Sequence, residues 1–201
     1  MDSPSSTRPA AGQVIVISGP SGAGKTTLLR KLLADCPLPL QRSVSATTRS
    51  PRPGEQPDVD YHFLSRDEFQ RRRQAGDFLE CCEVFGRGDW YGTLVSEVAP
   101  RLVRGKWVIL EVDVQGAMAV LEQYPDALTI FVLPGNIEQL QRRLAGRGTE
   151  SDESMARRLD AAARELSMAD RYRHRVVNEN LDQAVGDICA ILKQELNKSN
   201  E

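Results

Sequence analysis

One stretch of the sequence constrains the fold more than any other. Residues 19–26 read Gly-Pro-Ser-Gly-Ala-Gly-Lys-Thr and match the pattern G-x-x-x-x-G-K-[ST]. The apolar, β-branched run VIVIS at residues 14–18 precedes them, and four leucines at helical spacing follow, namely Leu28, Leu29, Leu32 and Leu33. The sequence therefore predicts a buried parallel strand, a glycine-rich loop and a helix in that order, which is the context in which this pattern binds phosphate groups.

The loop has a direct chemical interpretation. Its glycines allow successive backbone N–H groups to point at a β-phosphate, and the N-terminus of the following helix adds partial positive charge. Lys25 would bridge the β- and γ-phosphates, and the Thr26 hydroxyl would ligate Mg²⁺. The pattern occurs in motors, GTPases, transporter ATPases and small-molecule kinases, so it does not identify the acceptor. We expect the phosphoryl donor ATP to be bound by Gly19, Pro20, Ser21, Gly22, Ala23, Gly24, Lys25, Thr26 and Thr27.

Further apolar runs indicate an α/β fold for most of the chain. Alternating strands and helices form a parallel sheet with helices on its faces, as in P-loop NTPases. Besides the first strand and helix, the pattern predicts strands at residues 107–112, 128–133 and 175–178, and helices at 115–123, 137–144 and 182–196.

The segment 43–98 interrupts this alternation with short strand-like pieces (59–64 and 78–85), turn residues and a polar helix (67–75). It is interpreted as an inserted mixed α/β subdomain that binds the substrate. Residues 1–12 contain almost no apolar side chain and are expected to form a disordered tail. We therefore expect one domain over residues 13–197, with its core in 13–42 and 99–197.

Composition excludes several function classes. The net charge of −2 argues against a general electrostatic grip on nucleic acid. No apolar run approaches the ~20 residues that a membrane-spanning helix needs, and the N-terminus lacks the apolar core of a signal peptide, so a cytoplasmic protein is expected. The four cysteines show no metal-ligand spacing and are interpreted as reduced thiols.

The middle segment suggests a site for a monophosphate. Residues 45–55 read SATTRSPRPGE, and residues 60–63 read DYHF. Arg49 and Arg52, held close by a proline-stiffened loop, can pair around a dianionic phosphate, with Tyr61 as a neutral donor. Both stretches resemble the guanylate kinase fingerprints S-x-T-T-R-x-P-R-x-G-E and D-Y-x-F, and the resemblance runs from about residue 13 to residue 196.

Two later stretches extend the resemblance. Residues 78–80 (FLE) and 90–93 (WYGT) are similar to the family elements F-[IL]-E and Y-Y-G-[ST], although the segment 85–92 is two residues longer than usual and begins its motif with Trp90. The resemblance implies that Glu80 binds the adjacent N–H donors of guanine, which adenine lacks. It also implies guanine-binding hydroxyls on Ser45 and Thr93 and a second phosphate donor on Tyr91.

The run LEVDVQG at residues 110–116 resembles the family's L-[DE]-[IV]-D-x-Q-G, at the carboxyl end of a predicted strand where α/β sheets bind ligands. The resemblance places Glu111 at a position that contacts the acceptor nucleotide, and Asp113 could hold Mg²⁺ through water. For Asn178 and Glu179, contact with the adenine of ATP and capping of the last helix remain open as alternatives.

Residues 142–150 (RRLAGRGTE) and 157–159 (RRL) resemble the family's helical lid, expected at about 143–160. Arginines on a closing segment would stabilise the charge on the transferring phosphoryl group and exclude water. We expect Arg143 to assist, whereas Arg142 and Arg157 are interpreted as solvent-facing charges. The expected catalytic residues are Lys25, Arg52, Arg147 and Arg158.

The resemblance implies phosphorylation of GMP, and of dGMP, by ATP with Mg²⁺. It leaves open whether the chain is a monomer or a homo-oligomer. One alternative is a guanylate-kinase-like module that binds phosphopeptides in the same cleft, but such modules usually have a damaged phosphate loop, and Lys25 and Thr26 are present here. A second alternative is a kinase for a sugar phosphate. The set of Glu80, Ser45 and Thr93 argues against it, because a sugar phosphate has no guanine edge.

Overall fold

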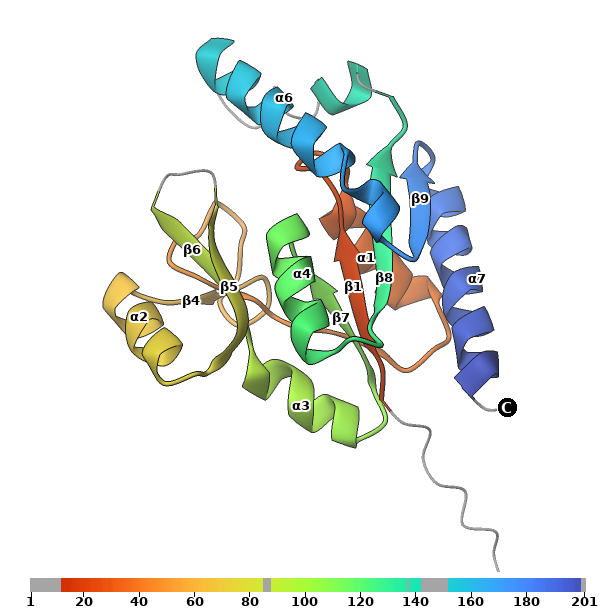
Figure 1. Cartoon of the computed structure of the whole chain (residues 1–201), viewed down its shortest axis with the longest axis horizontal. Coiled ribbons are helices and arrows are strands. Elements are labelled where there is room, and N and C mark those ends of the chain that lie inside the picture. The colour runs from red at the N-terminus through yellow and green to blue at the C-terminus, as the bar shows by residue number, and fades with distance from the viewer. Residues whose placement is uncertain (1–11, 85–87, 137, 142–151, 200–201) are drawn as a thin grey trace, which may run out of the picture.

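The computed structural model describes residues 12–84, 88–136, 138–141 and 152–199, and Figure 1 shows the elements as two sheets with their helices. The predicted tail, except Gly12, lies outside these residues. In chain order the elements are β1 (Val14–Ser18), α1 (Lys25–Asp35), β2 (Leu40–Arg42), β3 (Ala46–Thr47), β4 (His62–Phe63), α2 (Arg66–Gln74), β5 (Phe78–Val84), β6 (Asp89–Leu94), α3 (Val95–Val103), β7 (Trp107–Glu111), α4 (Val114–Gln123), β8 (Leu128–Pro134), α6 (Asp152–Leu166), a 3-10 turn (Ala169–Arg171), β9 (His174–Asn178) and α7 (Leu181–Ser199).

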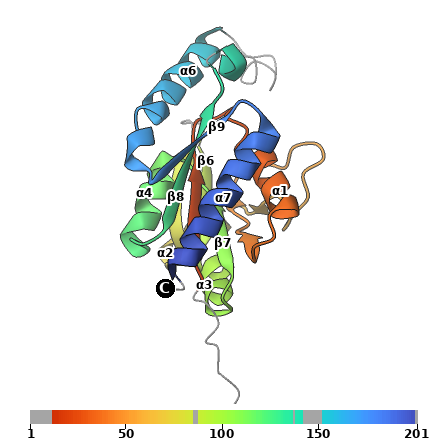
Figure 2. The same ribbon diagram turned by 90° about the vertical axis from the view of Figure 1, so that its right-hand side faces the viewer.

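The larger sheet has five parallel strands in the order β2-β7-β1-β8-β9. Its central strand β1 is buried along its whole length, because helices cover both faces. Successive side chains of a strand point to opposite faces, so Ile15 and Ile17 pack toward α1 and α7, whereas Val14 and Val16 pack toward α3 and α4. Figure 2 shows α1 and α7 on one face of this sheet and α4 on the other. The predicted parallel α/β architecture is confirmed.

The smaller sheet is mixed and has the order β4-β3-β6-β5. Strands β3 and β4 are parallel, whereas β6 is antiparallel to both β3 and β5. Helix α2 covers it through Phe69, which is fully buried and stacks on Phe78 with ring centroids 4.4 Å apart. Helix α4 of the larger sheet lies against β5, so the smaller sheet is attached beside the carboxyl ends of the parallel strands.

One predicted strand is largely wrong. In the segment expected to be a strand from 59 to 64, only His62–Phe63 is extended as β4. Asp58 has a left-handed φ of 62°, and the backbone N–H of Asp60 donates to the carbonyl of Gln56 at 3.0 Å. A tight turn therefore occupies residues 58–60, because backbone hydrogen bonds within the loop replace those of a sheet.

Helix α6 lies above the carboxyl ends of the parallel strands in Figure 1 and is called the lid helix below. The structure describes residues 138–141 of the helix predicted at 137–144, and there Leu140 packs against Ala162 of the lid helix. Arg142, Arg143 and Arg147 lie outside the described residues. The lid helix begins at Asp152, within the segment 143–160 where the lid is expected.

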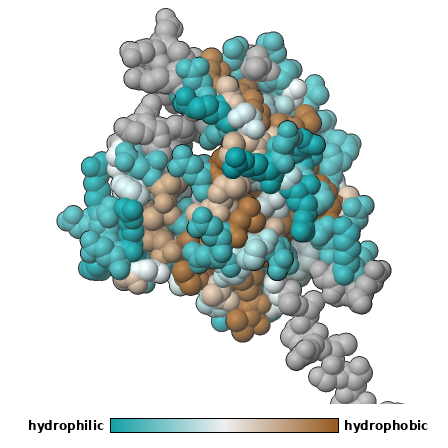
Figure 3. All heavy atoms as spheres, viewed as in Figure 1, coloured by the Kyte–Doolittle hydropathy of each residue, from teal (hydrophilic) through white to brown (hydrophobic). Residues whose placement is uncertain are grey.

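The surface seen in Figure 3 is largely hydrophilic, with hydrophobic residues showing in several places, including its lower edge. Val103, the last residue of α3, is 85% exposed. Scattered exposed apolar residues of this kind are normal in folded proteins. Among the helices that the structure describes, none is long and apolar enough to cross a membrane.

Candidate active site

The loop between β1 and α1 has the backbone shape that its glycines allow. Gly19 has a φ of +142°, and a Cβ atom there would lie 2.3 Å from the carbonyl oxygen of Val132. Gly24 has a left-handed φ of 87° immediately before α1 begins at Lys25. A side chain at Gly19 would clash with backbone, so the loop lies tightly against β8. This loop and the N-terminus of α1 lie where the sequence predicts a phosphate-binding site.

One long-range hydrogen bond and two local ones hold this loop. The Asn178 side chain is buried at the end of β9, and its Nδ2 donates to the carbonyl oxygen of Ala23 at 2.8 Å. Lys25 Nζ donates to the carbonyl oxygens of Gly19 at 2.5 Å and of Pro20 at 3.1 Å. Asn178 thus supports the loop itself, a role that neither sequence-based alternative included. Glu179 is exposed and packs against Gly135.

A hydroxyl and a carboxylate meet at the start of α1. Thr26 Oγ1 donates to Glu111 Oε1 at 2.6 Å, because Glu111 ends β7, the neighbour of β1 in the sheet. Arg42 Nη2 lies 3.6 Å from Glu111 Oε2. Asp113 caps α4 instead, where its Oδ1 accepts from the Gly116 N–H at 2.7 Å. The structure therefore places Glu111, rather than Asp113, next to the threonine expected to hold a metal.

The expected monophosphate site is built around Arg49. Its Nε donates to the Tyr91 hydroxyl at 3.0 Å, and its guanidinium makes a bidentate pair with Glu55, both N–O distances being 3.0 Å. The hydrogen bond from Arg49 lowers the pKa of Glu55. Burial raises the pKa of Tyr61, whose ring centroid is 5.4 Å from the Arg49 guanidinium carbon. Arg52 is exposed, and it lines the same pocket as Arg49, Tyr61 and Tyr91.

Glu80 is the buried acid of the site. It is 7% exposed and lies opposite Thr93 in the β5–β6 pair, where Thr93 Oγ1 donates to its Oε1 at 2.7 Å. A Cβ atom at Gly116 would lie 2.9 Å from Glu80 Oε2, so the carboxyl group fits closely against the first turn of α4. Burial raises the pKa of Glu80 to about 7, and the negative charge of Asp113 acts in the same direction. Such a carboxyl group suits a partner that presents hydrogen-bond donors.

One cavity of about 700 Å³ brings these groups together. This volume lies within the range of about 300–1,000 Å³ typical of small-molecule sites. Of the predicted site residues, it is lined by Gly19, Ser21, Gly22, Gly24, Lys25, Thr26, Thr27, Ser45, Arg49, Arg52, Tyr61, Glu80, Tyr91, Glu111 and Asp113. Pro20, Ala23, Thr93 and Asn178 support its walls, whereas Glu179 and the half-buried Arg158 are not part of the lining.

Several residues of this cavity carry no signal that a motif search would detect. Glu165 of the lid helix accepts a hydrogen bond from the Ser21 backbone N–H at 3.3 Å, and burial raises its pKa. Cys82 Sγ donates to Asp113 Oδ2 at 3.3 Å. For Glu165 the sequence offers one indication of a functional role, namely a charged residue on the inward face of an amphipathic helix. Arg42 was visible only as an ordinary charge, whereas Glu55 is the last residue of the fingerprint at 45–55 and had no predicted role of its own.

The sequence matches one protein family over nearly its whole length. The family model for guanylate kinase covers residues 11–195. The chain is 56% identical over 182 residues to a guanylate kinase of Rhodopirellula baltica, covering 90% of this chain and 87% of that protein. It is 47% identical over 184 residues to a guanylate kinase of Symbiobacterium thermophilum, covering 92% and 86%. The crystal structure of guanylate kinase from Anaplasma phagocytophilum superimposes with a TM-score of 0.77 at 32% identity, covering 93% of this chain and 87% of that one.

Proposed function

The chain belongs to the guanylate kinase family, and from this premise we propose that its large cavity transfers the γ-phosphoryl group of ATP to GMP, producing ADP and GDP. One observation carries the proposal. The same cavity is lined by the phosphate loop and by the buried carboxyl group of Glu80. A phosphate-binding loop beside a carboxyl group that reads donor atoms is what a kinase for a guanine nucleotide requires.

For the donor, residues 19–27 are proposed to bind the phosphates of ATP. Lys25 would move from the loop carbonyls, where it lies in this structure, to the β- and γ-phosphate oxygens. Asn178 holds the carbonyl of Ala23 and so keeps the loop in shape. Glu179, exposed beside Gly135, remains a proposed contact for the adenine.

The hard oxygen donors Thr26 and Glu111 fit Mg²⁺, which usually takes one or two protein oxygens together with substrate phosphates. Within the described ranges, no group of three or more His, Cys, Asp or Glu side chains could hold a metal by themselves. We propose that Thr26 and Glu111 would hold Mg²⁺, with Asp113 contributing through water. When bound, the ion would neutralise charge on the phosphates.

For the acceptor, Arg49, Arg52, Tyr61 and Tyr91 are proposed to bind the phosphate of GMP. The Arg49–Glu55 pair holds the guanidinium in position, so little side-chain entropy remains to be lost on binding. Glu80 would accept hydrogen bonds from the N1–H and 2-amino groups of guanine, and the hydroxyls of Ser45 and Thr93 would face its O6. The smaller sheet is thus proposed as the GMP-binding subdomain, over about residues 43–98.

The lid is proposed to complete the site. Arg147 and Arg158 would stabilise the charge on the transferring phosphoryl group when the segment 143–160 closes, and closure would exclude water. Arg52 lines the cavity next to the acceptor site and is proposed to assist. We also propose a cytoplasmic location, because ATP and GMP are available there.

The proposal is tested by a coupled assay of ADP release with ATP and Mg²⁺, in which GMP, dGMP, AMP, CMP and UMP are offered separately as acceptor. Turnover is expected with the guanine nucleotides. The Lys25→Ala variant is expected to lose turnover while it still binds GMP, because its contacts are with the donor. Turnover with AMP equal to that with GMP would contradict the role of Glu80, and an absence of turnover with every acceptor would contradict the kinase.

A further inference from the structure

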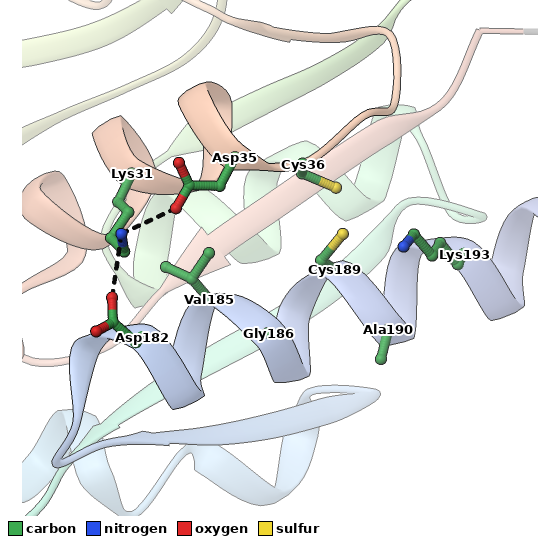
Figure 4. Close-up of a pocket in the computed structure, with 9 residues that line it drawn as sticks. All are labelled: Lys31, Asp35, Cys36, Asp182, Val185, Gly186, Cys189, Ala190 and Lys193. Carbon is green, nitrogen blue, oxygen red and sulfur yellow. Dashed lines mark ion pairs between the residues drawn. The ribbon is translucent and has the colours of Figure 1, made fainter.

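A second, smaller pocket lies between α1 and α7, the two helices on one face of the larger sheet. Its volume is about 370 Å³, and Figure 4 shows the residues that line it. At one end Lys31 pairs with Asp35 at 2.9 Å and with Asp182 at 3.0 Å. The charges at this end therefore have partners within the pocket. Toward the other end, the thiols of Cys36 and Cys189 face each other.

The two thiols come from different helices and pack in the same hydrophobic cluster. Cys36 is the C-cap residue directly after α1, and Cys189 lies in the middle of α7. Figure 4 shows the two sulfurs turned toward each other, and both cysteines are unoxidised in this structure. Cys36 is 7% exposed, whereas Cys189 is half-buried and reaches the pocket wall. Two thiols that face each other between two packed helices are placed so that a disulfide could join them.

We propose that Cys36 and Cys189 form a redox-active dithiol, which a disulfide oxidant such as oxidised glutathione converts into an intramolecular disulfide between α1 and α7. Cys189 is the more exposed of the two thiols that line the pocket. Its thiolate attacks one sulfur of the oxidant, which forms a mixed disulfide and releases one glutathione thiolate. The Cys36 thiolate then attacks Cys189 Sγ and releases the second. Two protein thiols are oxidised, one disulfide is reduced, and two glutathione molecules leave with the two protons.

The surroundings of the pair assign these roles. Burial, together with the neighbouring Cys189 thiol, raises the pKa of the Cys36 thiol to about 11, and this opposes a first attack by Cys36. Lys193, one turn after Cys189, lines the same pocket, and its positive charge favours the Cys36 thiolate. An added Cβ at Gly186 would meet nothing within 4 Å, so the pocket wall is open beside Cys189. The oxidant therefore reaches Cys189 first, and Cys36 resolves the mixed disulfide.

The bond would join residues far apart in the sequence without involving the active site. Neither cysteine lines the larger cavity, so turnover is expected to be unchanged after oxidation. A cross-link that closes a long loop lowers the entropy of the unfolded chain. The disulfide is expected to raise Tm by on the order of 5–10 °C. Strain in the bond would reduce this gain.

The test is to incubate the native full-length chain with oxidised glutathione, count free thiols, and digest with trypsin without reduction. We expect the loss of two of the four thiols and a linked peptide pair, residues 32–42 with residues 176–193. Cys81 and Cys82 share the peptide 74–87 and serve as an internal reference. Unmodified Cys36 and Cys189, or links of either to the peptide 74–87, would overturn the proposal.

Matched variants distinguish a cysteine pair that the fold positions from non-specific oxidation. Cys189→Ser is expected to abolish both the disulfide link and the rise in Tm. Cys36→Ser is expected to stop at a mixed disulfide between Cys189 and glutathione. Cys81→Ser is expected to leave the link and the rise in Tm unchanged. Oxidation in urea is the second control, because the preference for this pair is expected to disappear once α1 and α7 separate. A preference that survives in urea would show that the folded pocket does not create it. Circular dichroism on each variant establishes that it is folded before oxidation.

Discussion

Glu165 of the lid helix lies against the phosphate loop, where its Oε2 accepts a hydrogen bond of 3.3 Å from the backbone N–H of Ser21. This N–H belongs to the loop proposed to bind the phosphates of ATP, so the carboxylate and a phosphate oxygen would use the same donor. Burial raises the pKa of Glu165, whereas the charge of Lys25 opposes the shift. The lid helix and the phosphate loop are therefore coupled through one acidic side chain.

The Glu165→Gln variant is expected to lower the KM for ATP about three- to tenfold, because it keeps the shape of the side chain and removes its repulsion from the phosphates. Steady-state kinetics at saturating GMP measure the effect. Asp160→Asn, an exposed site on the same helix, is the matched control and should leave KM unchanged. A higher KM for ATP in Glu165→Gln would show that the carboxyl group supports nucleotide binding.

The charge state of Glu80 is expected to control GMP binding. With a pKa of about 7, the group loses its negative charge as the pH falls from 8 to 6, and only the charged form accepts both guanine donors. The affinity for GMP should fall by about tenfold per pH unit once the pH is well below 7. Calorimetric titrations across this range measure it.

Glu80→Gln separates this effect from ionisation of the GMP phosphate. The variant should bind GMP at least about tenfold more weakly at pH 8, and the pH dependence that remains would be that of the phosphate. Its KM for ATP should stay close to that of the parent. Equal pH profiles for parent and variant would exclude Glu80 as the titrating group.

The same substitution should stabilise the fold at high pH. The folded-state pKa of Glu80 lies above the ordinary value near 4.5, so the stability it contributes is fully present below about pH 4.5 and is lost as the pH rises through 7. Glu80→Gln is therefore expected to be more stable than the parent at pH 8, on the order of 2 kcal/mol, and equal to it near pH 4. Urea unfolding at both pH values tests this, and a variant less stable at pH 8 would contradict it.

Asn178→Ala should weaken ATP binding although Asn178 does not line the cavity. Removal of the amide leaves the carbonyl of Ala23 without its buried donor, so the loop loses a constraint on its shape, and the KM for ATP should rise about tenfold. Asn180→Ala is the control, because Asn180 Oδ1 accepts from the Gln183 N–H at the start of α7. The control should cost about 1 kcal/mol of stability and leave KM unchanged. Equal KM values for the two variants would remove Asn178 from the site.

Glu111 and Asp113 can be distinguished by their Mg²⁺ dependence. Glu111 Oε1 is 2.6 Å from Thr26 Oγ1, whereas both oxygens of Asp113 accept hydrogen bonds from Gly116 and Cys82. Glu111→Gln should raise the Mg²⁺ concentration for half-maximal activity about tenfold, and Asp113→Asn should raise it less. The opposite order would make Asp113 the more important metal-binding residue.

Some elements were predictable because their local signals are strong. The strand β1 and the helix α1 combine a continuous buried run, a glycine loop and leucines at helical spacing, and both were predicted within a few residues. The strands β2, β3 and β6 and the helix α3 were not predicted. The first two are only three and two residues long, β6 contains Gly92, and α3 contains Pro100. In α3, burial of Val98 outweighs the proline.

The sequence by itself determined the chemistry of this protein: the order of strand, glycine loop and helix, the paired arginines of the middle segment, and the acidic residues that follow its strands. The tertiary structure decided which of these groups meet. It placed Glu111 beside Thr26, Asn178 beneath Ala23, Glu165 on Ser21 and Cys189 against Cys36. Each of these contacts joins residues more than 80 positions apart in the chain, on strands or helices that only packing makes neighbours. Local patterns report which groups a chain carries, but crossover connections and side-chain packing determine their partners.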